Sequence, residues 1–172
     1  MGRQELIALV EIADKQRLFE QIVAENSRRL RIVAWNNSSG DQYKDLEQEI
    51  LLALWTSLDR FEGRSGLTTW FYRVALNTAH AFTRRNFRRN RETGPSAGKE
   101  PATAGNWQNR DPVSILEEFV HSLGELDRSV FLMYLDDLSY REISQAIQID
   151  EANLRVWVSR LKKQFESRYI GG

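Results

Sequence analysis

The chain has 172 residues and no cysteine, and its 24 Lys and Arg balance its 24 Asp and Glu, so the formal net charge is zero. The absence of cysteine excludes disulfide frameworks, thiolate zinc sites and cysteine nucleophiles, and the neutral total argues against nucleic-acid binding, which usually requires a basic domain. No apolar run reaches the roughly 18 residues of a membrane-spanning helix, and the charged N-terminus does not resemble a signal peptide, so we expect a cytoplasmic protein.

The balance of charge is not uniform along the chain. Residues 1–91 hold 15 basic and 11 acidic side chains, whereas residues 92–172 hold 9 and 13. One basic cluster has no acid within it: Arg84, Arg85, Arg88, Arg89 and Arg91. The other is opposed only by Glu166: Arg155, Arg160, Lys162, Lys163 and Arg168. Because like charges repel, such clusters indicate an anionic partner, although a solvated helix face is the alternative.

Helical spacing of apolar residues recurs and strand-type alternation is absent, which predicts an all-α fold. In the N-terminal part we expect helices over residues 4–13, 16–35, 45–58 and 68–89. The third helix carries one apolar line, formed by Leu46, Ile50, Leu54 and Leu58, and Glu47 falls inside the same arc.

A break in pattern follows the fourth helix. All three prolines lie between positions 95 and 112, together with Gly98 and Gly105. This composition predicts a flexible linker over residues 93–112 that joins two small helical domains, 1–92 and 113–172. In the second domain we expect helices over residues 114–124, 127–136, 140–147 and 151–169.

The fourth helix carries two distinct faces. Its core face is apolar: Trp70, Phe71, Val74, Ala75, Thr78 and Phe82. The neighbouring face has polar residues at spacings of 4, 3 and 4: Arg73, Asn77, His80 and Arg84. Arginines can hold phosphates and an amide can hydrogen-bond a base edge, so this row suits a nucleic-acid strand. A solvated amphipathic helix would have a similar pattern.

The last two predicted helices have the pattern of a helix–turn–helix. Ser139 and Glu142 form a capping box, and Asp150 can cap the next helix. That helix has an apolar side and, opposite it, a polar and cationic side: Arg155, Ser159, Lys162 and Lys163, with Ala152 and Val156 between these four residues. A short helix, a tight turn and a second helix with a cationic face are typical of DNA binding. An ordinary helical hairpin is the alternative, since the turn has no glycine.

Two segments resemble a known family. The run from Asp45 to Ala79, with its Trp-Phe-Tyr-Arg-Val-Ala stretch and Asn77, closely resembles the second conserved region of ECF (extracytoplasmic function) sigma factors, the promoter-recognition subunits of bacterial RNA polymerase. The segment Leu-Ser-Tyr-Arg-Glu-Ile at residues 138–143, with the helix that follows, resembles their fourth region.

The resemblance assigns roles to three groups of residues. Contacts to core RNA polymerase are expected at Asp45, Leu46, Gln48, Glu49 and Leu52. Contacts to the −10 element, including a pocket for a flipped base, are expected at Phe61, Gly63, Arg64, Ser65, Arg73, Asn77, His80, Arg84, Arg85 and Arg88. Contacts to the −35 element are expected at Ala152, Arg155, Val156, Ser159, Arg160, Lys162 and Lys163.

The chain departs from the family pattern at three positions. Where this chain has Glu47, many members have an apolar residue. Where it has Val156 and Trp157, many members have small or polar residues. Trp157 lies at the edge of the apolar side, so we expect it to pack rather than to read bases.

The expected partners are core RNA polymerase and promoter DNA, with an anti-sigma factor as a further candidate because family members are often held by one. A free-standing helix–turn–helix regulator remains an alternative, but it leaves the row from Arg73 to Arg84 without a purpose. An enzyme is not expected: there are two histidines, and no glycine-rich phosphate loop or metal-ligand spacing, so neither a cofactor nor a metal is predicted.

Overall fold

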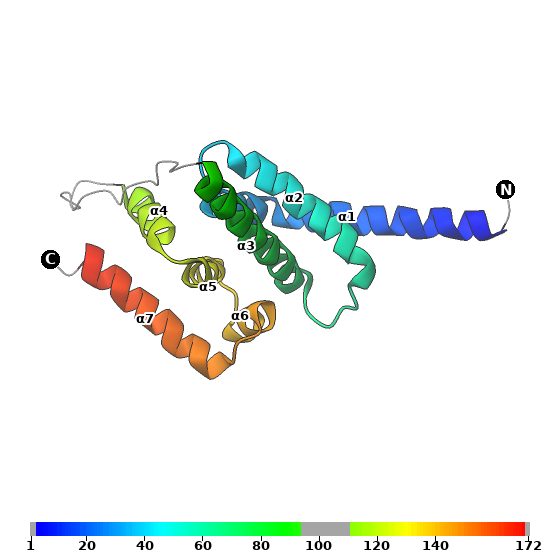
Figure 1. Cartoon of the computed structure of the whole chain (residues 1–172). Helices are drawn as coiled ribbons and strands as arrows, with labels where there is room; N and C mark the ends of the chain where they lie inside the picture. The colour runs from blue at the N-terminus through cyan, green and yellow to red at the C-terminus, as the bar shows by residue number, and fades with distance from the viewer. Residues whose placement is uncertain (1–2, 94–110, 171–172) are drawn as a thin grey trace. The chain divides into compact units, whose positions relative to one another are not determined.

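The computed structural model describes residues 3–93 and 111–170, and every regular element within them is helical (Figure 1). The elements follow in the order α1 (Arg3–Asn36), α2 (Gln42–Ser57), the 3₁₀ turn η1 (Leu58–Arg60), α3 (Leu67–Thr93), α4 (Pro112–Ser122), α5 (Glu125–Leu135), α6 (Tyr140–Ile147) and α7 (Glu151–Tyr169). The all-α prediction is confirmed. The chain divides into two compact units, residues 1–82 and 83–172. Most of the predicted linker lies outside the described residues, so the domain boundaries remain a prediction.

The first helix differs from the prediction. We expected two helices separated near residue 14, whereas α1 is continuous from Arg3 to Asn36. Residues 14–17 are all polar, which interrupts the apolar periodicity without interrupting the helix. The sequence of α1 contains no glycine or proline, and Gln16 Nε2 donates to Glu20 Oε1 at 2.9 Å. Pairs at this spacing stabilise an exposed helix, so the two predicted segments form one element.

Three further helix boundaries differ from the predicted ones by two to four residues. Helix α4 begins at Pro112, two residues earlier than predicted, because the Asp111 carboxylate accepts from the Ser114 N–H and proline fits the first turn. Helix α5 also begins two residues early, at Glu125. Helix α3 continues to Thr93, four residues beyond the predicted end.

The core of the N-terminal unit is built on α1, α2 and α3. The predicted apolar line of α2 is confirmed: Leu46, Ile50 and Leu54 are fully buried, and Leu58 is nearly so. Their partners in the core include Ile22, Val33, Phe71, Tyr72 and Ala75. At the edge of this core, Lys15 Nζ lies 4.5 Å from the Trp55 ring centroid and 2.8 Å from Asp59 Oδ2. This pair of contacts ties α1 to the end of α2 and to η1.

The core of the C-terminal unit centres on Phe119 of α4, which is fully buried. Its ring makes edge contacts at 5.2 Å with Phe131 of α5 and with Phe165 of α7. Arg128 holds the carboxyl end of α4 by donating to the carbonyls of Val120, His121 and Leu123 at 2.9 to 3.1 Å. The last carbonyls of a helix lack i+4 partners, and of these three the Val120 carbonyl also accepts from the Leu123 N–H at 3.3 Å. One guanidinium therefore locks the α4–α5 junction.

The predicted capping of the helix–turn–helix is confirmed. Ser139 Oγ accepts from the Glu142 N–H, while a Glu142 carboxylate oxygen accepts from the Ser139 N–H. Asp150 accepts from the Ala152 N–H at the start of α7. Gln148 adopts the left-handed conformation, with φ +59°, that glycine usually supplies after a helix. The tight turn therefore forms without glycine.

No helix in the described residues is long and apolar enough to cross a membrane.

Candidate nucleic-acid interface

The outer side of α2 presents four of the five predicted polymerase contacts. Asp45, Gln48 and Leu52 are exposed, Leu52 by 63%, and Glu49 is half-buried. Leu46 differs from them because its side chain is fully buried in the core. Leu52 is thus an exposed apolar side chain among polar ones on this side, whereas Leu46 supports α2 from the inside.

The loop between η1 and α3 is held by aromatic packing. The Phe61 and Trp70 rings lie 5.2 Å apart, and Trp70 is only 8% exposed. Gly63 has φ +68°, a conformation that a side chain would strain. Arg64 forms an ion pair with Glu62 in the same loop. Of the predicted loop contacts, Arg64 is therefore partly neutralised, and Phe61 is anchored on α3 by its ring.

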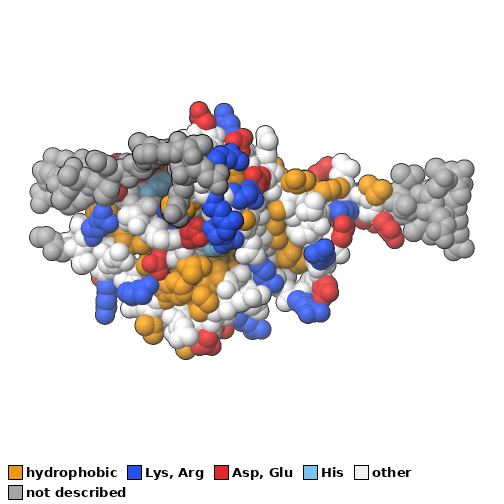
Figure 2. Space-filling view, in the orientation of Figure 1, with side chains coloured by type: hydrophobic (Ala, Val, Ile, Leu, Met, Phe, Trp, Pro, Cys, Tyr) orange, Lys and Arg blue, Asp and Glu red, His pale blue; other side chains and the backbone are white. Residues whose placement is uncertain are grey.

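The predicted strand-binding row lies along α3. Asn77 is exposed, Arg73 and His80 are half-buried, and Arg84, Arg85 and Arg88 are exposed. Within the described part of the chain, Arg84 and Arg88 form no ion pair. Figure 2 shows Lys and Arg side chains gathered over the course of α3. These two arginines, one helical turn apart, are available to an anionic chain.

Helix α7 presents a continuous exposed face. Its buried side consists of Leu154, Val158 and Leu161, all fully inaccessible. The opposite side carries a central stripe of exposed residues at helical spacing: Ala152, Val156, Ser159 and Lys163. A shallow groove of about 590 Å³ runs along it, lined by Arg155, Val156, Ser159, Arg160 and Lys163. The structure thus brings together five of the seven predicted −35 contacts.

Neighbouring helices hold the cations that flank this stripe. The Arg155 guanidinium lies 4.9 Å from the Tyr140 ring centroid, on α6. On the other flank, Arg160 Nη2 lies 3.0 Å from Asp127 Oδ1 of α5. Such contacts restrict long side chains to few rotamers before any ligand arrives.

Trp157 packs against the protein, in the manner predicted. It is half-buried, and its Nε1 donates to the Asp127 carboxylate that also binds Arg160. Asp127 was not among the predicted site residues. It is 30 residues from Trp157 in sequence, and an acid in the first turn of a helix is common, so nothing in the sequence alone marks it.

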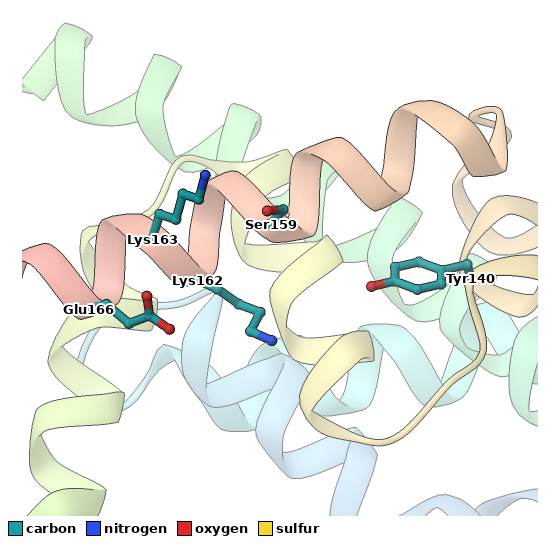
Figure 3. A pocket seen from close by; sticks show the side chains of 5 residues that line it. All are labelled: Tyr140, Ser159, Lys162, Lys163 and Glu166. Carbon is teal, nitrogen blue, oxygen red and sulfur yellow. The ribbon is translucent and has the colours of Figure 1, made fainter.

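A second depression adjoins the same face. It has a volume of about 250 Å³ and is lined by Tyr140, Ser159, Lys162, Lys163 and Glu166 (Figure 3). Lys162 from α7 and Tyr140 from the start of α6 project toward the same space in this view. Lysines and hydroxyl groups are common phosphate ligands at protein–DNA contacts.

Among the described residues, no cluster of His, Asp and Glu could hold a metal ion.

Comparisons with known proteins agree with this arrangement. The family model for sigma-70 region 2 matches residues 22–89, and the model for sigma-70 region 4 matches residues 114–165. The ECF RNA polymerase sigma-E factor of Escherichia coli K12 is 26% identical over 182 residues, which cover 96% of this chain and 93% of the relative. The corresponding factor of Haemophilus influenzae is 23% identical over 178 residues, with 96% and 94% covered.

Two solved structures share the fold. One is the sigma factor RpoE from Bartonella quintana in complex with the anti-sigma factor NepR, with a TM-score of 0.68, 22% identity, and 87% of this chain and 94% of that chain covered. The other is CnrH in complex with the cytosolic domain of CnrY, with a TM-score of 0.63, 19% identity, and 88% and 87% covered. Two sigma-70 regions lie in the expected order and together cover more than half of the chain, and the curated relatives match over nearly their whole length. The chain belongs to the sigma-70 family of RNA polymerase sigma factors and is of the ECF type.

Proposed function

We propose that this chain binds core RNA polymerase, directs it to promoters and helps to open the DNA there. The exposed side of α2 docks on the polymerase. The loop after η1 and the row on α3 bind the separated strand of the −10 element, and α7 enters the major groove of the −35 element. The observation that carries the proposal is the joint presence of a helix with exposed arginines, Arg84, Arg85 and Arg88, and a helix–turn–helix with a cationic outer face.

The chain contributes binding energy and no chemical step. Extracting a base from the stack costs a few kcal/mol, and phosphate contacts along α3 together with a base contact from Asn77 would offset that cost. The reaction itself belongs to the polymerase. The protein works where polymerase and chromosome are, in the cytoplasm.

An anti-sigma factor is a further proposed partner. Two proteins with this fold were solved with a bound partner, described in one case as an anti-sigma factor. The exposed Leu52 on α2 offers a partner the same apolar contact that it offers the polymerase. Sequestration of the chain would then compete with docking on the polymerase.

Reconstituted transcription tests the proposal. Purified chain and core polymerase are incubated with a library of random duplexes, and bound sequences are selected and transcribed. We expect enrichment of two separated elements and transcripts that start downstream of them. Failure to bind core polymerase, or binding without initiation, would overturn the proposal. Tight and specific duplex binding by the chain alone would favour a free-standing regulator instead.

A further inference from the structure

The exposed face of α7 carries an apolar side chain where cations dominate. Val156 is 71% exposed, the most exposed of the large hydrophobic side chains in the described residues. Arg155 and Arg160 lie on either side of it, and Lys163 lies two turns along the same stripe. Cations on both flanks favour an anionic partner over an apolar protein surface. The ligand must therefore be anionic around its rim and apolar at one central point.

The neighbours of Val156 leave it prominent. The residues one turn away on the central stripe are Ala152 and Ser159, both small and exposed. A β-branched side chain on a helix has one strongly preferred rotamer. The two methyl groups of Val156 are consequently held in one position, so little side-chain entropy is lost when they make a contact.

Duplex DNA has one group that meets both requirements. In the major groove, the thymine 5-methyl group is the apolar feature by which a T·A pair is recognised, and phosphates border the groove on both sides. A valine methyl group can pack directly against that methyl group, whereas the hydroxyl group of a serine makes no such apolar contact.

We propose that Val156 determines specificity in the −35 element by contacting the 5-methyl group of a thymine, while Arg155 and Arg160 hold positions on either side. This inference rests on the proposed function and deepens it, because it names the chemical group that the centre of α7 reads.

The test removes one methyl group at a time. Holoenzyme made from core polymerase and the full chain first selects its upstream element from random duplexes. Each thymine of that element is then replaced singly by deoxyuridine, which lacks only the 5-methyl group. Binding of each duplex is measured for the unmodified chain and for Val156→Ser. The matched control is Val113→Ser, because Val113 is also an exposed valine of the C-terminal unit, 60% accessible, but lies on α4.

We expect one thymine at which deoxyuridine weakens binding of the unmodified chain about three- to fivefold, the effect of one lost methyl contact. Val156→Ser should lose that sensitivity, and Val113→Ser should keep it. The inference is overturned if the element contains no thymine, if no replacement weakens binding by about twofold, or if Val156→Ser remains equally sensitive. If the holoenzyme selects no sequence at all, the proposed function fails with it, so the two failures are distinguishable.

Discussion

Helices α3 and α7 both present cations, but they hold them differently. On α7, Arg155 lies over the Tyr140 ring, Arg160 pairs with Asp127, and Lys162 Nζ lies 5.7 Å from the Tyr134 ring centroid. On α3, Arg84 and Arg88 are exposed and have no ion pair within the described residues. The cations of α7 are therefore held in place by their neighbours, whereas Arg84 and Arg88 can adapt to a ligand.

The difference matches the two kinds of DNA proposed for these helices. A duplex groove has a nearly fixed shape, so side chains that are already positioned lose little entropy on binding. A separated strand is flexible, and long unpaired arginines can follow its phosphates. The contrast suggests that α7 supplies sequence discrimination, whereas α3 supplies electrostatic capture.

Removal of Arg84 and Arg88 from α3 should have the largest effect. Arg84→Ala combined with Arg88→Ala should cost about 3 kcal/mol in affinity for the melted −10 strand, from roughly 1.5 kcal/mol per charge-assisted contact. The salt dependence of that binding should fall by about 1.4 in log–log slope. Titration of holoenzyme with single-stranded −10 DNA measures both.

The −35 duplex serves as the internal reference for this pair of changes. Its affinity should not change, and Arg17→Ala, which removes an exposed arginine of α1, should leave both ligands unaffected. Equal losses on strand and duplex would contradict the division of roles between α3 and α7.

Loss of Arg155 should have the next largest effect, now on duplex binding. Arg155→Ala should weaken −35 binding by about 1–3 kcal/mol if the guanidinium makes a bidentate base contact. Tyr140→Leu keeps an apolar side chain but removes the ring face, so it should reproduce a fraction of that loss. Competition binding against −35 duplexes checks both variants. A Tyr140→Leu variant as weak as Arg155→Ala would indicate that the ring contacts DNA itself.

Asp127 should matter only through the residues that it holds. Asp127→Asn keeps an acceptor for Trp157 but loses the charge opposite Arg160. We expect a loss of about 1 kcal/mol in −35 affinity and coupling of similar size with Arg160→Ala, as contacting residues commonly show. A double-mutant cycle on −35 duplexes measures the coupling, and thermal denaturation of each variant provides the control. Strict additivity would show that Asp127 does not position Arg160.

Loss of the capping box should have the smallest effect, a pH-dependent decrease in thermal stability. Hydrogen bonds from the Ser139 side chain and then its backbone hold the pKa of Glu142 below its ordinary value. A carboxyl group whose pKa is lower in the folded protein than in the unfolded chain stabilises the fold at pH values above its unfolded-state pKa. That contribution is lost as the pH falls through its folded-state pKa.

Ser139→Ala removes the largest cause of that shift. The difference in Tm between the unmodified chain and this variant should be widest at neutral pH and should narrow as the pH falls below about 4.3. Ser167→Ala, at an exposed position near the end of α7, is the control. A pH-independent difference would mean that the Glu142 carboxylate does not take part.

Local patterns in the sequence predicted the helices well and the contacts between them poorly. Ser139, Glu142 and Asp150 act within one turn, so spacing alone was enough to assign their caps. The continuity of α1 was missed because the four polar residues at positions 14–17 interrupt the apolar periodicity of the sequence.

Contacts over long sequence separation left no local signal. Asp127 reaches Trp157 and Arg160 only because α5 packs beneath α7. The family resemblance assigned Leu46 to the polymerase contacts, whereas the helical spacing placed it in the apolar line of α2, and its side chain is fully buried in the core. The family pattern identifies which helix bears a site, and packing decides which of its side chains are available.

The central claim is that α3 binds the separated strand of the −10 element and α7 binds the closed duplex of the −35 element. Permanganate reactivity of thymines near the −10 element, measured together with protection of the −35 element, tests this most directly in holoenzyme with Asn77→Ala. The account predicts that −35 protection and core binding persist while permanganate reactivity falls severalfold, because the lost hydrogen bond is made only to the extracted base. Unchanged reactivity, or parallel loss of −35 protection and core binding, would contradict it.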